Sequence, residues 1–218
     1  MSRKWLKLIL IIGVLVLIGF ISWGPIMSNV EHPKYQVLSS EGKIEIRIYN
    51  PMIVAEVTVQ GERKEAISEG FRFLADYIFG NNIKNSSISM TAPVMQQQNQ
   101  KIAMTAPVSQ LAADDGWIVN FVMPAEYSLD TLPKPNNNKV VIKEIPSKEF
   151  AVIQFSGMNT NNNISSHEEK LKSYVVNKEL IILSDPVYAF YNPPWTLPLL
   201  RRNEVLIEID NVNKLMRE

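Results

Sequence analysis

The sequence predicts an α+β fold in which a unit of strand pair, helix and further strands occurs twice. Three observations predict it: an internal repeat of alternating apolar and polar residues, a helical pattern after each copy, and a return to strand-like segments after each helix. We therefore expect a distorted antiparallel β-barrel that carries two helices, preceded by one transmembrane helix at the N-terminus.

The repeat joins two segments that align without a gap. Residues 44–61 read IEIRIYNPMIVAEVTVQG, and residues 140–157, ninety-six positions later (140 minus 44), read VVIKEIPSKEFAVIQFSG. Each copy alternates apolar and polar residues on either side of a proline-containing turn, which is typical of a half-buried antiparallel hairpin or bent strand. The alternative is that two unrelated strand-turn-strand segments look alike. The segments that follow favour a duplication, with pseudo-repeats at about 44–123 and 140–210.

A helix is predicted after each copy. The first lies within residues 62–80 and ends at Gly80. Its apolar face has spacings of four, three and four: Ile67, Phe71, Leu74 and Ile78. For the second, Ser165 and Glu168 form a capping box that opens the helix. Its apolar face comprises Leu171, Tyr174 and Val175.

Two near-identical hexapeptides follow the first helix. Residues 89–94 read SMTAPV and residues 103–108 read AMTAPV. We expect a hairpin whose methionines point inward and whose prolines end the pairing, because proline cannot donate to a strand ladder.

Composition limits the function. The chain has 218 residues and 22 basic against 22 acidic residues, so electrostatic capture of nucleic acid is not expected. It has no cysteine, which excludes disulfides, thiolate nucleophiles and cysteine-based metal sites. We expect one domain over residues 35–218.

The N-terminal residues form a separate unit. Residues 1–4 carry basic charge, and residues 5–23 form an apolar span with one charge, Lys7, near its start. Nineteen residues at about 1.5 Å each cover about the thickness of a bilayer core. The pattern predicts a cytoplasmic N-terminus, a single-pass anchor, a tether over residues 24–34, and a domain on the extracytoplasmic (periplasmic or extracellular) side. A cleaved signal sequence is the alternative, although no A-x-A-like site is present.

Four motifs resemble the SOUL family of haem-binding proteins: IEIRIYNP, YIFGNN, SMTAPV and PPWTLPLLRRNEVLIEI. The resemblance covers about residues 35–210 in the family's order. It implies a duplicated, distorted antiparallel barrel with two helices, and binding of haem or another tetrapyrrole in a surface groove beside the first helix. A weaker resemblance, at the level of the fold, is to GyrI-like modules that bind drug-sized amphipathic molecules between their two halves.

The sequence departs from the family where some members are thought to use a histidine in the first strand, because Ile48 occupies the matching position. Two histidines remain. His32 lies in the tether. His167 lies in the first turn of the second predicted helix, where it is a weak candidate for a metal ligand and where solvent exposure is the alternative.

The predicted cofactor site uses the first helix. Phe71, Ala75 and Phe79 are spaced i, i+4 and i+8, so they form a stripe on which a flat apolar ring could stack. Arg72 beside the stripe is predicted to pair with a propionate, and Arg201 and Arg202 offer a second pair of cations next to a proline-rich run. The alternatives are that the stripe belongs to the core and that the arginines are solvated.

No catalytic residues are predicted, because motifs for nucleophilic, phosphate-binding or zinc-dependent catalysis are absent from the sequence. The adjacent carboxylates at 114–115 and 168–169 are explained as solvated charge. The expected function is therefore non-enzymatic: a membrane-tethered carrier, buffer or scavenger of haem. A module for other amphipathic small molecules and a protein-interaction domain are the alternatives.

Overall fold

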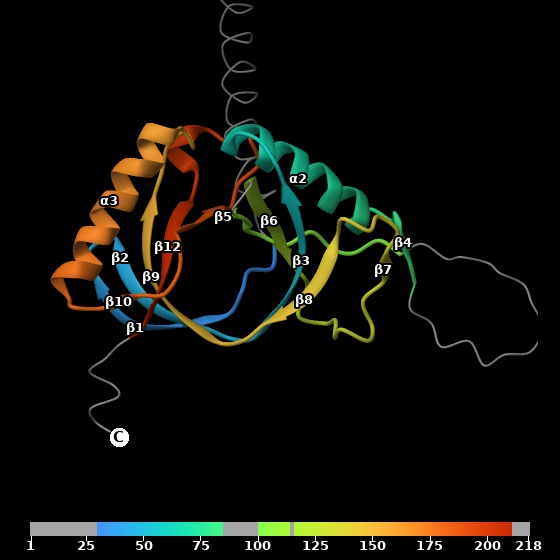
Figure 1. Ribbon diagram of the computed structural model, residues 1–218, viewed down its shortest axis with the longest axis horizontal. Coiled ribbons are helices and arrows are strands. Elements are labelled where there is room, and N and C mark those ends of the chain that lie inside the picture. Colours follow the sequence, from blue (N-terminus) through green and yellow to red (C-terminus); the bar gives the residue numbers. More distant parts are fainter. Residues whose placement is uncertain (1–29, 85–99, 114–115, 211–218) are drawn as a thin grey trace, which may run out of the picture.

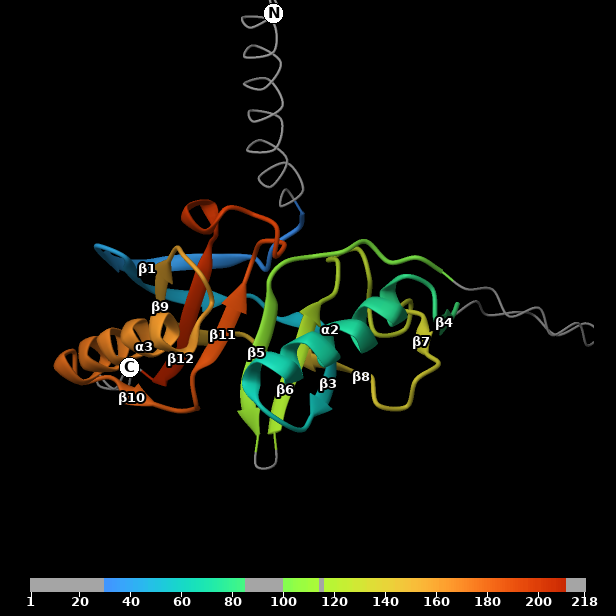
Figure 2. The same ribbon diagram turned by 90° about the horizontal axis from the view of Figure 1, so that it is seen from above.

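The computed structural model describes residues 30–84, 100–113 and 116–210 (Figures 1 and 2). The predicted membrane span, the first SMTAPV hexapeptide and the carboxylates at 114–115 lie outside these ranges. No helix within the described ranges is both long and apolar enough to span a bilayer.

The elements follow the order that the sequence predicts, two strand-rich units with one long helix each. The first unit contains β1 (Tyr35–Glu41), β2 (Ile44–Tyr49), β3 (Met52–Val59), α2 (Arg63–Ile78), β4 (Asn82–Ile83), β5 (Val108–Ala113), β6 (Gly116–Val122) and β7 (Lys134–Pro135). The second contains β8 (Val141–Ile145), β9 (Lys148–Phe155), α3 (Asn161–Asn177), β10 (Ile181–Ile182), β11 (Val187–Phe190), the 3-10 turn η1 (Pro198–Leu200) and β12 (Asn203–Asp210).

The two repeat segments pair with each other through two ladders. β2 pairs with β9 and β3 pairs with β8, all antiparallel. In both ladders the paired residue numbers have one sum, as in Ile44 with Ile153 and Met52 with Ile145, which both add to 197. A twofold axis that relates the two copies exchanges each residue with the one 96 positions away (140 minus 44). Such an exchange requires the same sum in both ladders. The bent-strand interpretation is therefore correct, and the hairpin interpretation is wrong because β2 and β3 do not pair with each other.

The sheet curls strongly but does not close. Its order is β1-β2-β9-β12-β11-β5-β6-β3-β8, with β10 added on β12, so β1 and β8 form its two edges. Figure 1 shows the sheet as a half-barrel with α2 and α3 on its outer side. The fold is thus α+β with two helices and a strongly curled antiparallel sheet, and the predicted barrel is open.

Helix α2 packs on β3 and β6 through a face of small and large apolar residues. Leu74 and Ile78 are buried as predicted, whereas Phe71 remains 38% exposed. Gly70 allows the close approach, because a Cβ at this position would lie 2.6 Å from the side chain of Val119. The helix is therefore held against the sheet at its middle.

Helix α3 begins earlier than predicted. Its N-cap is Thr160, whose side chain accepts a hydrogen bond from the Asn163 amide at 3.3 Å. The capping box at Ser165 and Glu168 is wrong, because both residues lie inside the helix. The Glu168 side chain instead contacts Lys172 and the Tyr188 hydroxyl.

The second hexapeptide is not the strand of a hairpin. Among its residues only Val108 enters a strand, the start of β5. Thr105 forms an isolated parallel bridge with Glu31, and Met104 is 39% exposed rather than inward-facing. The segment therefore fastens the start of the described chain to the fold.

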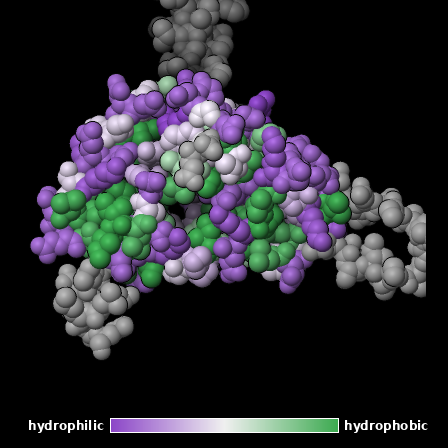
Figure 3. Space-filling view, in the orientation of Figure 1, coloured by the Kyte–Doolittle hydropathy of each residue, from purple (hydrophilic) through white to green (hydrophobic). Residues whose placement is uncertain are grey.

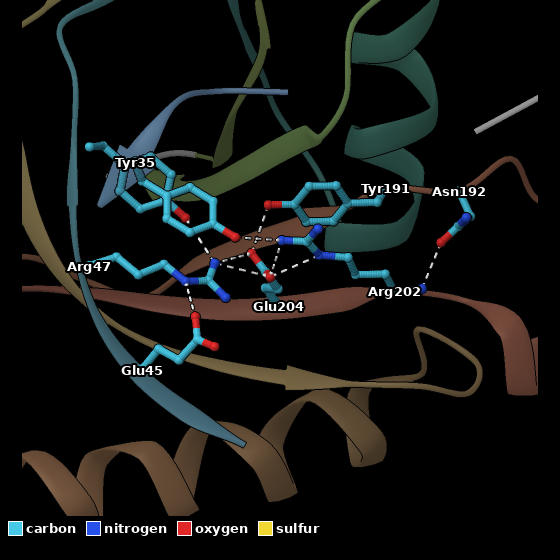
Figure 4. Close-up of polar contacts among 8 residues, drawn as sticks. Tyr35, Glu45, Arg47, Tyr191, Asn192, Arg202 and Glu204 are labelled. Atoms are coloured by element: carbon cyan, nitrogen blue, oxygen red, sulfur yellow. Dashed lines mark hydrogen bonds and ion pairs between the residues drawn. The ribbon is translucent and has the colours of Figure 1, made fainter. Parts of the chain in front are cut away.

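A buried ionic network ties β2 to β12 on the inner face of the sheet (Figure 4). Glu204 is fully buried, and both of its carboxylate oxygens lie 3.1 Å from Nη1 of Arg47. Arg202 donates to Glu204 Oε1 at 2.7 Å, and the Tyr191 hydroxyl donates to Oε2 at 2.7 Å. Glu45 accepts from Arg47 Nε at 2.7 Å. Two guanidinium groups and two carboxylates thus balance in charge.

The network predicts a large cost for removing its central charge. Glu204→Gln leaves two guanidinium groups facing a neutral amide, so we expect the free energy of unfolding to fall by about 3–5 kcal/mol. Urea unfolding followed by circular dichroism measures this. The control is Glu41→Gln, which removes an exposed ion pair with Lys178 and should change stability by at most about 1 kcal/mol. An equally small effect at Glu204 would contradict the assignment.

Candidate functional site

The predicted stripe on α2 is partly at the surface. Phe79, the C-cap of the helix, is 57% exposed and Phe71 is 38% exposed, while Ala75 between them is buried. Phe71 rests edge-on against the buried Phe121 ring, with centroids 5.4 Å apart. Arg72 is exposed beside the stripe. The helix therefore presents two aromatic rings to solvent, and the core interpretation holds only for Ala75.

An open hollow of about 380 Å³ lies at the C-terminal end of α2. It is lined by Phe79, Gly80, Asn81 and Lys101. Lys101 is exposed and is brought here by a hydrogen bond from the next residue, Ile102, whose amide donates to the carbonyl of Ile78 at 2.8 Å. The hollow thus combines an exposed aromatic ring with a cation, a pairing suited to a flat apolar molecule that carries a carboxylate.

Arg201 is not part of the α2 stripe. It lies between β11 and β12, where its guanidinium donates to the carbonyl of Thr196 at 2.8 Å and to that of Pro194. Its Nη1 lies 3.6 Å from the sulfur of Met158. The structure therefore shows Arg201 holding its own loop, and its predicted role in the cofactor site stays a prediction.

His167 is packed rather than solvent-exposed. Its ring stacks on Phe155 with centroids 4.2 Å apart, and its Nδ1 lies 2.7 Å from the carbonyl of Asn163. Because a carbonyl only accepts, Nδ1 carries a proton, and in the neutral ring Nε2 keeps its lone pair. This tautomer would allow metal ligation, but His167 belongs to α3, which covers the other half of the sheet from α2 (Figure 1).

His32 packs onto the fold. Its ring meets Tyr191 edge-on with centroids 5.3 Å apart. Burial lowers the pKa of His32 below its ordinary value, and the nearby Arg202 lowers it further. The ring is therefore neutral at neutral pH.

A second candidate surface is a groove on the inner face of the sheet. Its volume is about 430 Å³, within the range of small-molecule sites. Strands of both repeat units line it with apolar side chains, including Met52, Val54, Leu111, Phe150 and Leu206. Figure 3, drawn in the orientation of Figure 1, shows a hollow between the two repeat units.

Two lysines that line the groove are already paired with carboxylates. Lys143 contacts Glu56 at 2.6 Å, and Lys148 contacts Glu208 at 2.7 Å. The groove therefore offers mainly apolar contact, with the charge of both lysines neutralised and with Glu144 as a further carboxylate in the lining, which suits an amphipathic molecule.

The buried network beside the groove keeps its two phenols protonated. Burial, together with the Glu204 carboxylate, raises the pKa of Tyr49 to about 12 and that of Tyr191 well above its ordinary value. Both phenols therefore stay protonated at neutral pH. Within residues 30–84, 100–113 and 116–210, no group of three or more histidine or acidic side chains could hold a metal ion.

Sequence reasoning missed Lys101 and the residues that line the groove, although the GyrI-like resemblance implies a small-molecule site between the two halves. Lys101 stands in a polar stretch before the second hexapeptide, where charge is expected without any function. The sequence does contain a sign of the groove. In β3 and β9 the positions expected to be polar in the alternation include the apolar residues Val54 and Phe150. Apolar residues on both faces of a strand indicate that both faces are covered or that one of them binds a ligand.

Curated relatives resemble this chain over most of its length. Heme-binding protein 2 of Homo sapiens is 29% identical over 169 residues, which cover 75% of this chain and 77% of the relative. Heme-binding protein 1 of Xenopus laevis is 30% identical over 142 residues, covering 65% of this chain and 70% of the relative.

Solved structures show the same fold at low sequence identity. The EcmrR–DNA complex matches with a TM-score of 0.53 and 11% identity over 81% of this chain and 58% of that one. An uncharacterised conserved protein from Listeria innocua matches with a TM-score of 0.51 and 10% identity over 79% of this chain and 94% of that one. These matches concern the fold alone.

The family model described as SOUL heme-binding protein matches residues 30–208, which include all the described strands of the curled sheet except the last residues of β12. The curated relatives agree with this assignment. The chain therefore belongs to the SOUL heme-binding protein family.

Proposed function

We propose that this domain binds haem or a related tetrapyrrole without catalysing a reaction, as a carrier, buffer or scavenger. The observation that carries the proposal is the exposure of Phe79, at 57%, beside Lys101 in the hollow at the end of α2. Membership of a family of haem-binding proteins makes a tetrapyrrole the first ligand to consider.

The site would hold the ligand by apolar contact and one or two charges. Phe79 offers a ring face for stacking, and Lys101 and Arg72 offer partners for propionates. Fully burying a phenylalanine is worth roughly 1.5–3 kcal/mol, so two partly exposed rings support moderate affinity.

The same proposal includes a membrane tether. The apolar span at residues 5–23 would act as a single-pass anchor, with the domain on the extracytoplasmic side. What supports it is the length of the span, its positive flank and its terminal tryptophans.

A second candidate function is binding of another amphipathic small molecule in the inner groove. The observation that favours it is the mostly apolar lining contributed by both repeat units, as by Leu111 and Phe150. If the protein binds neither ligand, a protein-interaction domain is the remaining alternative.

A haemin titration followed by absorbance tests the α2 site. We expect a saturable Soret shift at one equivalent with the full-length chain. Phe79→Glu should raise the Kd roughly tenfold or more, because it removes the stacking ring and adds a charge that repels propionates; tenfold corresponds to about 1.4 kcal/mol. The matched control is Val176→Glu, near the end of α3 and 66% exposed. Equal loss in both variants, or unsaturable binding, would refute the α2 site.

The histidine on α3 provides a separate test of ligation. We expect His167→Ala to leave the haemin spectrum and Kd unchanged, because the ring stacks on Phe155 away from the α2 stripe. Met104→Leu is the companion variant that tests ligation by a methionine sulfur, since this exposed thioether follows Lys101 in the same segment. A lost or shifted Soret band in His167→Ala would place the iron on α3 instead.

Filling the groove separates the two candidate functions. Ser109 lines the groove from β5, so Ser109→Trp should occupy part of its volume. An amphipathic dye that binds in the groove should lose affinity at least tenfold in this variant, while haemin affinity stays unchanged. The control is Phe79→Glu, which should leave dye affinity unchanged. Dye binding that Ser109→Trp does not affect would exclude the groove.

A further inference from the structure

The loop between β11 and β12 exposes an unusual amount of apolar surface. Its exposed side chains and their exposed fractions are Trp195 at 63%, Leu197 at 48%, Leu199 at 86% and Leu200 at 46%. Connecting loops normally present polar residues to water, and a cluster of exposed large apolar side chains marks a contact surface. We call these four residues the apolar loop.

The apolar loop is held in this conformation by hydrogen bonds. The Thr196 amide donates to the carbonyl of Pro193 at 3.0 Å, and Arg201 Nε donates to the carbonyl of Thr196 at 2.8 Å. From outside the loop, the Gly157 amide donates to the carbonyl of Pro198 at 2.8 Å. Thr196 is buried at 3% exposure, so the loop is anchored by its polar residue while its leucines face outward. A rigid loop loses little conformational entropy when its surface is covered.

The base of the loop lies beside the start of the described chain. The Tyr191 amide donates to the carbonyl of Arg202 at 3.2 Å, which closes the loop. Val30 packs in the same apolar cluster as Tyr191, and His32 contacts the Tyr191 ring. Figure 2 shows the red loop next to the blue start of the described chain.

Chain length then limits where the loop can be. The predicted membrane span ends at Trp23, seven residues before Val30 (30 minus 23). Seven residues reach at most about 25 Å when fully extended. If the span crosses a bilayer, Val30 must lie within this distance of the bilayer surface, and the base of the apolar loop lies beside Val30.

We propose that the apolar loop inserts into the interfacial region of the bilayer that holds the predicted anchor. This rests on the membrane tether included in the proposed function. Tryptophan favours the membrane interface, and leucine side chains are stabilised below it. Because the tether makes the encounter intramolecular, a small apolar surface is sufficient for docking. The insertion fixes the orientation of the domain, with the start of α3 toward the membrane and its end away from it.

Site-specific labelling tests the proposal, since the chain has no native cysteine. Full-length Leu199→Cys and Val176→Cys are labelled with an environment-sensitive fluorophore and reconstituted in phosphatidylcholine–phosphatidylglycerol vesicles, with and without brominated acyl chains. Val176 is the matched control because it is also exposed but lies near the far end of α3, a helix about 25 Å long. We expect bromine to quench the label at 199 severalfold and to leave the label at 176 unchanged.

Flotation of the same samples separates the two proposals. If the chain does not float with vesicles, the tether fails and the docking falls with it. If it floats while both labels are equally unquenched, the docking is wrong and the tether stands. If the label at 199 is shielded without bromine quenching and the chain migrates as a dimer, a second copy covers the loop, which also overturns the proposal.

Discussion

The pairing of two long bent strands is the constraint on which the rest of the structure depends. One strand runs through β2 and β3 and the other through β8 and β9, antiparallel in a single register. Each also pairs with a further strand along its other edge, β12 on β9 and β6 on β3, and these pairings set the curl of the sheet. The helices then cover the convex face, and the inner face becomes the groove.

Much of the fold could be predicted because its signals are local. The alternation of apolar and polar residues predicted the strands, and helical spacing placed Leu74 and Ile78 in the core. Gly80 marked the end of α2. The partners of the strands could not be read from alternation, which is the same for a hairpin and for a bent strand that pairs with a distant segment. The capping error at Ser165 has a similar origin, since Thr160, five residues earlier, is also a favoured N-cap residue.

The candidate site was predicted less completely because function here depends on which residues stay uncovered. Spacing placed Phe71, Ala75 and Phe79 on one side of α2, but only packing decided that the alanine is buried and that Phe79 is exposed. Arg47 and Glu204 illustrate the opposite case. Their charges suggest solvent exposure, yet both are buried because each neutralises the other across β9. Tertiary contacts of this kind leave no mark in a single sequence.

The exchange of strands between the two units also determines how the chain must assemble. Ile44 pairs with Ile153, a partner that is synthesised 109 residues later (153 minus 44). Until then β2 has an open edge on the side of β9, and the last partner of β9, β12, is made near the end of the chain. Contacts between such distant segments slow folding and prolong the time during which strand edges can aggregate. Neither unit is therefore an independent folding domain, and folding is completed only after β12 has left the ribosome.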